Sequence, residues 1–400
     1  MLREAWHKHG DALRLAAIVL MAIAAFVWLG YEFGRLLFDL GPLGAVDLDM
    51  RLEEVQAWFR GEPVYGAIRT AVYPPASYAI LWPLVGWLGI TPARWLYAFT
   101  AAAALAWLVR LLVRLSGARS RTERVFIGLI PLSIYATGAT IGNGQVIIYI
   151  MPVLIAGLLL LCRRSSGLWK DILGSFLLAL ALVKPSVAAP FLWIVLFVPG
   201  RLRPALLTGF GYVGMTALAL SFQESAPLSL IDGFRKGTEQ MLSSAEALQY
   251  SHANVQSWLA SFGLSEWIPS ASLALFAGLG VWTYFHRRRD VWQLAGVAAL
   301  VARFWTFHGW YDDLLVVLPL IALFRVATSG GSRMGDDRVA GVLFAATLLT
   351  LMAPGGLYLF PEPWNLVYVA GQTCVWGAAL AFLVVRPCAA AIQSSGRRPS

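Results

Sequence analysis

Long apolar stretches recur along the whole chain, and short basic segments separate them. Hydrophobic residues make up 58% of the 400 residues and charged residues only 13%, against roughly 25% charged in soluble domains. Backbone polar groups that lie in a hydrocarbon core must be satisfied internally, and helices achieve this. The sequence therefore predicts an all-α polytopic membrane protein that forms one integral membrane domain over residues 1–400.

The apolar pattern predicts a bundle of about 12–13 membrane helices. The expected spans are residues 13–33, 74–90, 92–113, 125–137, 146–161, 172–183, 186–198, 204–222, 268–285, 291–304, 313–326, 339–354 and 365–385. Several of these are shorter than the roughly 20 residues that a straight crossing requires. The first span has no small-residue cleavage site after it, so we expect an uncleaved helix.

Basic residues cluster in connections that the positive-inside rule assigns to the cytoplasm. They lie in Arg110–Arg124, Arg163–Lys170, Arg201–Arg203, Arg287–Arg289, Arg325–Arg338 and the tail 386–400. This explains the net charge of +9 without a nucleic-acid partner. The remaining connections then face outward, into the periplasm if the protein lies in an inner (plasma) membrane. They are residues 34–72, 138–145, 184–185, 223–269, 304–312 and 354–365.

The assignment of residues 74–161 contains a conflict. The acidic loop before it faces outward and the basic loop 110–124 inward, which requires an odd number of crossings, yet residues 74–113 resemble two helices. We therefore expect one short segment between residues 74 and 161 to be re-entrant or a half-helix, or else the loop 110–124 to face outward. Such backbone is tolerated at membrane depth only beside protein or a water-filled cavity.

The first outer loop, residues 34–72, holds the densest cluster of acids. Leu48, Leu52, Val55 and Phe59 recur at helical spacing, which predicts an interfacial helix with Arg51, Glu53, Glu54 and Arg60 on its other faces. Asp47 then falls at the helix N-terminus, where aspartate is a common cap. A general base that accepts a proton from a hydroxyl group is the alternative role, and both are compatible.

The order of several short motifs resembles glycosyltransferase family 87, the polyprenyl-phosphate-mannose-dependent mannosyltransferases of the GT-C fold. The motifs are Asp47, Gly61, Pro63-Val64-Tyr65, Tyr73-Pro74-Pro75, Gly144-Gln145-Val146, Lys184-Pro185, Asn254-Val255-Gln256-Ser257 and Tyr311-Asp312. Two features depart from the family pattern: an extra residue follows Asn254, and the segment 304–310 is unusually aromatic. These departures concern the acceptor more than the fold.

The resemblance implies transfer of a hexose, with mannose expected, from a polyprenyl-phosphate sugar to a lipid or glycan acceptor. Asp47 would be the base, and the anomeric carbon would be inverted. The departing phosphate needs cations or donors. For donor binding we consider Lys184, His308, Arg303, Gln145 and His252. Further site residues expected from the motifs and the acidic loop are Asp49, Tyr73, Asn254, Tyr311 and Asp312.

Simpler interpretations exist for single residues. Lys184 near a helix end is compatible with snorkelling to the headgroups, and His308 with an interfacial aromatic belt. Asn143-Gly144-Gln145 is also a turn signal. Asp47-Leu48-Asp49 has an Asp-x-Asp spacing, but two carboxylates are too few for a hard cation, so we predict no cofactor and no required metal.

Two other functions use similar architecture. A flippase or transporter of lipid-linked sugars is expected to show internal repeats and charges near the membrane midplane, and neither is visible. An outer-leaflet oligosaccharide polymerase would use arginines of the large outer loop 223–269, which contains only Arg235 and Lys236 as cations. The placement of polar residues on one face favours an enzyme.

Overall fold

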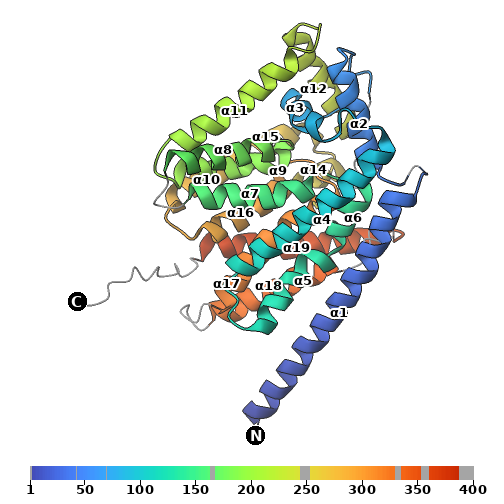
Figure 1. Ribbon diagram of the computed structural model, residues 1–400. Coiled ribbons are helices and arrows are strands. Elements are labelled where there is room, and N and C mark those ends of the chain that lie inside the picture. The colour runs from blue at the N-terminus through green and yellow to red at the C-terminus, as the bar shows by residue number, and fades with distance from the viewer. Residues whose placement is uncertain are drawn as a thin grey trace.

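Each apolar segment expected to cross the membrane overlaps a helix in the computed structural model (Figure 1). The structure describes residues 2–41, 43–68, 70–162, 167–243, 253–328, 335–352 and 360–386. The helices of the apolar segments are α1 (Leu2–Phe38), α3 (Pro75–Val85), α4 (Ile90–Leu115), α5 (Arg121–Ser133), α6 (Tyr135–Asn143), α7 (Ile147–Leu161), α8 (Leu168–Ala181), α9 (Pro185–Ala188), η1 (Ala189–Phe191), α10 (Leu192–Phe197), α11 (Arg203–Leu220), α15 (Ile268–His286), α16 (Val291–Trp305), α17 (Val317–Thr328), α18 (Asp336–Met352) and α19 (Trp364–Val385).

Within the described residues, four helices are long and apolar enough to cross a membrane: Leu15–Phe38, Ile90–Leu115, Ser265–His286 and Trp364–Val385. The pair α5 and α6, bent by 45°, would form a fifth span. Other apolar helices have only 10–17 residues, among them α7, α16 and the segment 185–197. These findings confirm an all-α polytopic membrane protein and the expectation that several segments are too short to cross in straight form.

The short helix α3 bears on the topology of residues 74–161. Its eleven residues extend only about 16 Å, roughly half of a hydrocarbon core. Pro75 begins the helix and a second proline, Pro83, lies inside it. α3 is therefore short enough for the expected half-helix and α4 is long enough for a complete crossing, while the topology itself stays a prediction.

The expected helix is present as α2 (Val46–Phe59), and its interfacial position stays a prediction. Leu48, Leu52 and Val55 of the predicted apolar stripe are buried. Arg51 and Glu54 lie on other faces of the helix than the apolar stripe, as the spacing predicts, and both are nevertheless buried, at 7% and 0% exposure. They form an ion pair of 2.6 Å with each other, and this pairing makes their burial tolerable.

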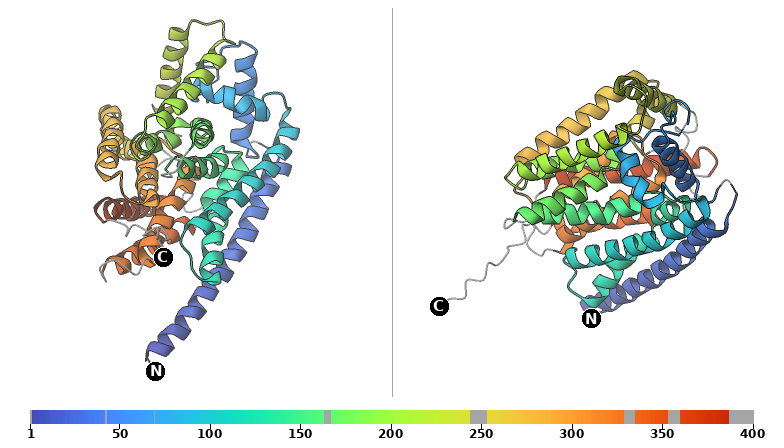
Figure 2. Two further views of the ribbon diagram at one scale, coloured as in Figure 1. Left: turned by 60° about the vertical axis from the view of Figure 1, so that its left-hand side comes forward. Right: turned by 45° about the horizontal axis from the view of Figure 1, so that its top comes forward.

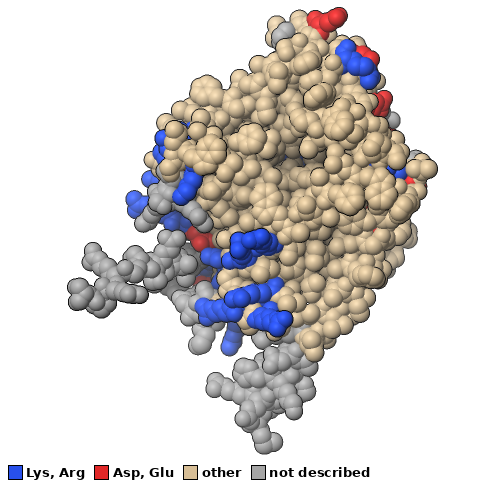
Figure 3. Space-filling model, in the orientation of Figure 1, with Lys and Arg blue, Asp and Glu red and all other residues tan. Residues whose placement is uncertain are grey.

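Four further elements complete the described part of the chain. They are α12 (Pro227–Ser243), α14 (Val255–Ser261), η2 (Ser265–Trp267) and η3 (Trp310–Val316). In all three views α2, α3 and α12 lie together at one end of the bundle (Figures 1 and 2). On the face seen in Figure 3, most lysines and arginines gather at the opposite end, with a broad uncharged band between. The polar helices and the basic loops thus occupy opposite ends.

Candidate active site

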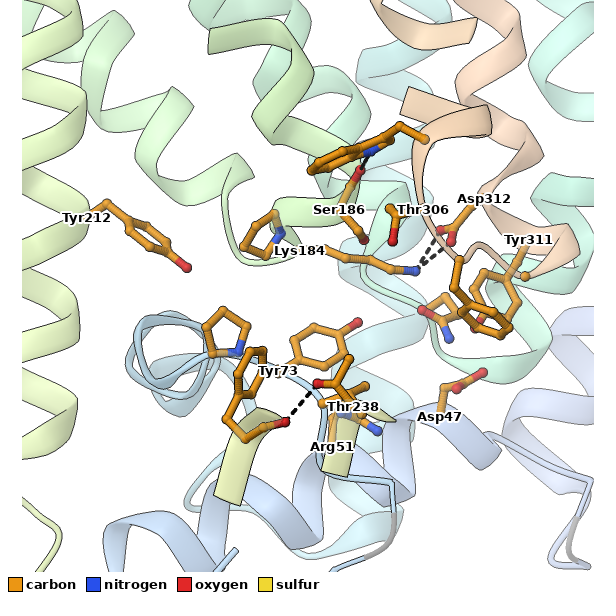
Figure 4. A pocket seen from close by; sticks show the side chains of 18 residues that line it. Asp47, Arg51, Tyr73, Lys184, Ser186, Tyr212, Thr238, Thr306, Tyr311 and Asp312 are labelled. Atoms are coloured by element: carbon orange, nitrogen blue, oxygen red, sulfur yellow. Dashed lines mark hydrogen bonds and ion pairs between the residues drawn. The ribbon is translucent and has the colours of Figure 1, made fainter. Parts of the chain in front are cut away.

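A cavity of about 440 Å³ lies inside the end of the bundle where α2, α3 and α12 meet. Segments that are far apart in sequence converge on it (Figure 4). Its lining consists of Asp47, Arg51, Val72, Tyr73, Pro74, Gln145, Lys184, Pro185, Ser186, Tyr212, Phe234, Thr238, Trp305, Thr306, Phe307, Gly309, Tyr311 and Asp312. Six residues selected from the sequence therefore share one cavity: Asp47, Tyr73, Gln145, Lys184, Tyr311 and Asp312.

The backbone around the start of α2 places Asp47 at the cavity. The N–H of Ala45 donates to the Gly142 carbonyl at 3.1 Å, which ties α2 to the end of α6. Gly144 ends α6 with φ +77°, and a Cβ there would lie 2.4 Å from Leu48 Cβ. Glycine is therefore required twice at this position, for its backbone conformation and for the close approach of α2.

Asp47 is the second residue of α2, so it does not occupy the N-cap position, which is Ala45. The carboxylate is partly buried. Burial raises its pKa above the ordinary value, while the Gln145 side chain, as a hydrogen-bond partner, and the positive charges of Arg51 and Lys184 lower it. The positive end of the helix dipole also favours the anion. Asp47 is thus a carboxylate with raised basicity that faces an enclosed space.

Lys184 and Asp312 form an ion pair on the opposite wall (Figure 4). Lys184 Nζ lies 2.8 and 2.7 Å from the two carboxylate oxygens of Asp312 and 4.9 Å from the centre of the Tyr311 ring. Burial opposes ionisation of Asp312, but Lys184 and His308 outweigh it and hold its pKa at about 2. The Lys184 side chain is only 13% exposed, so it points into protein and does not snorkel.

His308 supports this ion pair from behind. Its Nδ1 lies 2.9 Å from Asp312 Oδ2, and since an ionised carboxylate can only accept, Nδ1 carries the proton. Burial lowers the pKa of His308. The side chain is fully buried and does not line the cavity, which places it outside any surface aromatic belt. His308 therefore acts on the cavity through Asp312.

Arg51 extends from α2 to the ring of Tyr73 and lines the same cavity as Asp47. Its guanidinium donates to Glu54 at 2.6 Å and to the Thr70 carbonyl at 3.1 Å, and it stacks 4.5 Å from the centre of the Tyr73 ring. Burial raises the pKa of Glu54 to about 7, and Arg51 opposes this shift. Arg51 was not predicted as a site residue, although its position four residues after Asp47 places both on one face of a helix.

Arg303 is deeper in the bundle than expected for a donor-binding residue. It is 1% exposed and forms an ion pair with Asp313, which also accepts from the Tyr135 hydroxyl. Arg303 does not line the cavity. The structure therefore places it under the site, where it contributes to the support of η3.

The other expected residues do not line the cavity. Asp49 is exposed on the far side of the first turn of α2. Asn254 is the N-cap of α14, where its Oδ1 accepts from the Ser257 N–H at 2.8 Å. The neighbouring Gln256 donates to Thr306, which does line the cavity, at 3.3 Å. His252 lies outside the described residues.

Several cavity residues carried no sequence signal. Ser186, Tyr212, Thr238 and Thr306 were not among the residues predicted from the sequence, and packing brings them together. Within the described part of the chain, no three His, Cys, Asp or Glu side chains lie close enough together to hold a metal ion. The absence of a metal requirement therefore stays a prediction.

The cavity combines a carboxylate that can accept a proton, Asp47, with a cation that can bind an anion, Lys184. The family model for glycosyltransferase family 87 matches residues 71–309, more than half of the chain. The chain belongs to glycosyltransferase family 87. It is therefore a multi-pass membrane glycosyltransferase, which uses a sugar donor and an acceptor. No curated protein and no solved structure gives a significant match.

The matched residues contain most, but not all, of the cavity. Tyr73, Gln145, Lys184 and Thr306 lie inside the matched range. Asp47 and Arg51 precede it, and Tyr311 and Asp312 follow it. The geometry thus joins residues from the family region to α2 and η3, which the sequence match does not cover.

Proposed function

We propose that this family 87 member transfers a hexose, with mannose as the expected sugar, from a polyprenyl-phosphate donor to an acceptor hydroxyl at the outer face of the membrane. The observation that carries the proposal is the arrangement of Asp47 opposite the Lys184–Asp312 pair across one cavity (Figure 4). The positive-inside assignment supports the outer location, since the basic loops lie at the other end of the bundle.

Asp47 is the general base in this proposal. The acceptor oxygen attacks the anomeric carbon, its proton passes to an Asp47 carboxylate oxygen, and the bond from that carbon to the phosphate oxygen breaks. One displacement inverts the anomeric configuration. A carboxylate is a better base when its pKa is raised toward the working pH, and burial raises the pKa of Asp47.

Lys184 binds the departing phosphate. The amine is held by both oxygens of Asp312, so little reorganisation is needed when charge develops on the leaving group. Arg51 provides a second positive charge on the opposite wall, and its planar guanidinium suits phosphate oxygens. With Asp47 and Asp312 ionised, the two cations balance the two carboxylates, so the loss of either cation would leave a net negative charge that repels the phosphate.

The other cavity walls exclude water and orient the sugar. Tyr73, Trp305, Phe307 and Tyr311 supply aromatic faces, while Ser186, Thr238 and Thr306 place hydroxyl groups among them. Pockets for small polar ligands commonly combine such apolar walls with a few directed polar groups. A single sugar ring surrounded in this way is shielded from hydrolysis by solvent.

The large outer loop provides no support for the polymerase alternative. Arg235 and Lys236 form ion pairs with Glu239 and Asp232 along the exposed surface of α12. Both side chains are exposed by more than 65%, and neither lines the cavity. The cations nearest to the site come from α2 and from the start of α9.

A transfer assay in lipid nanodiscs tests the proposal. Polyprenyl-phosphate-mannose and a panel of lipid and glycan acceptors are supplied to the native chain, to Asp47→Asn and to Asp49→Asn. Asparagine keeps the size of the side chain but cannot accept the proton. We expect Asp47→Asn to reduce kcat by roughly a hundredfold or more, and Asp49→Asn to retain native activity because Asp49 is exposed away from the cavity.

Native activity in Asp47→Asn would remove this residue from catalysis. Transfer by the native protein from another polyprenyl-phosphate sugar, and not from this donor, would contradict mannose as the sugar. The role of Asp47 as the base would then be tested with that other donor. Movement of lipid-linked sugar between leaflets without transfer would favour the flippase alternative.

A further inference from the structure

A second cavity of about 270 Å³ lies on the other side of α2. Its lining consists of Leu48, Arg51, Leu81, Pro83, Leu84, Val85, Leu96, Tyr97, Thr100, Gly144, Val146 and Tyr149, from α2, α3, α4 and the start of α7. We call it the lateral cavity. It is not needed for the sugar-transfer chemistry proposed above, and its walls are mostly hydrocarbon.

The lateral cavity lies beside the 440 Å³ cavity that holds Asp47, which we call the catalytic cavity, and single residues of the backbone separate the two. Asp47 lines the catalytic cavity and the next residue, Leu48, lines the lateral one. In the same way Gln145 faces the catalytic cavity while Gly144 and Val146 line the lateral one. Arg51 lines both. A molecule that fills the lateral cavity therefore reaches within one residue of the base.

The polar groups of the lateral cavity are already occupied by protein partners. The Thr100 hydroxyl lies 2.8 Å from the Tyr149 hydroxyl and donates to the Leu96 carbonyl at 2.7 Å. The Tyr97 hydroxyl lies 2.8 Å from the Gln145 carbonyl oxygen and 3.1 Å from that of Thr140. A ligand in this space finds few free donors or acceptors apart from Arg51, so the space suits hydrocarbon better than a sugar or water.

Exposed apolar and aromatic side chains border the lateral cavity on the surface of α3 and α4. Pro83 and Leu84 line it and are exposed, and Leu84 is 45% exposed. Trp82, Trp87 and Trp95 lie nearby in sequence and are also exposed, at 42%, 64% and 42%. Tryptophan favours the boundary between headgroups and hydrocarbon. Since α4 is long and apolar enough to cross the membrane, this surface faces lipid near the headgroup level.

We propose that the lateral cavity binds the hydrocarbon chain of the acceptor, so that the acceptor is an amphiphile whose hydroxyl-bearing head reaches Asp47 past Arg51. This inference rests on the proposed function, because it assigns the acceptor side of that reaction. Position favours the acceptor over the donor. Leu48, the neighbour of the proposed base Asp47, lines the lateral cavity, whereas Lys184, which is proposed to bind the departing phosphate, lies across the 440 Å³ cavity.

Photo-crosslinking tests where such a chain binds, and it needs no turnover. The probe is a dodecyl mannoside with a diazirine in its alkyl chain, added to the full protein in nanodiscs and followed by peptide mapping. We expect label on residues 81–85, 96–100 or 146–149, displaced by unlabelled dodecyl mannoside and not by a long-chain polyprenyl phosphate. Displacement by the polyprenyl phosphate would assign the lateral cavity to the donor chain and overturn the proposal, as would the absence of label there.

Cavity-filling substitutions provide a second measurement. Leu96→Phe and the larger Leu96→Trp add side-chain volume inside the lateral cavity. Phe99→Trp is the matched control on the same helix, because Phe99 is 69% exposed and lines neither cavity. We expect Leu96→Trp to weaken crosslinking by about tenfold, the effect of one unfavourable overpacking contact. Equal labelling of all variants would contradict the proposal.

Activity separates this inference from the proposed function. With a sugar donor present, the Leu96 variants should raise KM for dodecyl mannoside and leave KM for the short hexyl mannoside close to native. If no variant and no native protein transfers sugar, but label still appears in the lateral cavity, then the proposed reaction fails while the amphiphile site remains. If transfer occurs and KM shows no dependence on chain length or on Leu96, the acceptor chain binds elsewhere.

Discussion

Lys184 and Asp312 are 128 positions apart in sequence, and yet the lysine amine contacts both oxygens of the aspartate, at 2.8 and 2.7 Å. The pair closes the catalytic cavity on the side opposite α2 (Figure 4). Because Asp312 is fully buried, its charge is compensated mainly by Lys184 and by its hydrogen bond with His308. The pair therefore both binds the donor, as we propose, and stabilises the fold of η3.

Removal of the Lys184 charge should lower kcat strongly and change the KM of the acceptor little. We expect Lys184→Met to reduce kcat by roughly a hundredfold, the usual effect of losing one group that stabilises transition-state charge. Steady-state kinetics in nanodiscs measures this. Lys236→Met on the exposed face of α12 is the control and should behave as native protein. A rise in acceptor KM with unchanged kcat would contradict a role at the phosphate.

The pH dependence of activity should report the ionisation of Asp47. A base acts when deprotonated, so kcat/KM should rise with pH through a midpoint above the ordinary aspartate value, because burial raises the pKa of Asp47. Gln145 favours the anion, and Gln145→Leu should therefore move the midpoint to higher pH. An unchanged midpoint in this variant would show that Gln145 does not act on Asp47.

Glu54 should make the fold less stable as pH rises. Burial raises the pKa of Glu54 from 4.5 to about 7. Between these values the folded protein holds a proton on Glu54 that the unfolded chain releases. The contribution of this group to the free energy of unfolding is therefore complete below pH 4.5 and is lost as the pH rises through about 7. The shift corresponds to about 3 kcal/mol as an order of magnitude. Thermal unfolding of the native protein should show Tm falling across this window.

The matched pair Glu54→Gln and Glu53→Gln isolates this contribution. Glutamine keeps the size of Glu54 and has no titrating proton, although its Nε2 cannot accept the hydrogen bonds that Arg51 and Tyr78 donate to Oε2. The Tm of Glu54→Gln should therefore vary less with pH than that of the native protein. Glu53 is exposed on the same helix, and Glu53→Gln should retain the native pH profile. Identical profiles for all three proteins would exclude Glu54 as the source.

Gly144→Ala should disturb the site from a distance. The new Cβ would meet Leu48 Cβ at 2.4 Å and would force an alanine into φ +77°, with an expected loss of about 1–3 kcal/mol. The first turn of α2 must move, and Asp47 with it, so transfer activity should fall. Gly66→Ala is the control: it has φ +81° but open space around its Cβ, so it measures the backbone strain alone. Equal effects of the two substitutions would exclude the contact with Leu48 as a cause.

The sequence by itself determined the helical class, the overlap of each apolar segment with a helix, and the amphipathic helix that carries Asp47. These follow from local rules: apolar runs must form helices in lipid, and helical spacing places Asp47 near the start of α2. The sequence also predicts six site residues that line one cavity in the structure: Asp47, Tyr73, Gln145, Lys184, Tyr311 and Asp312. Gln145 and Lys184 were singled out because the short motifs Gly144-Gln145 and Lys184-Pro185 resemble those of glycosyltransferase family 87.

The tertiary structure alone decided which charges face the cavity. Arg51 and Glu54 have the residue types of an exposed helix face, but Thr70, Tyr73 and Tyr78 from the following loop and helix bury them and supply their partners. Arg303 has the residue type of a phosphate ligand, but Asp313 binds it beneath the site. The lateral cavity likewise arises between α2, α3, α4 and α7, so local sequence cannot reveal it. Burial and pairing depend on contacts across the whole chain, and these are what the sequence pattern does not contain.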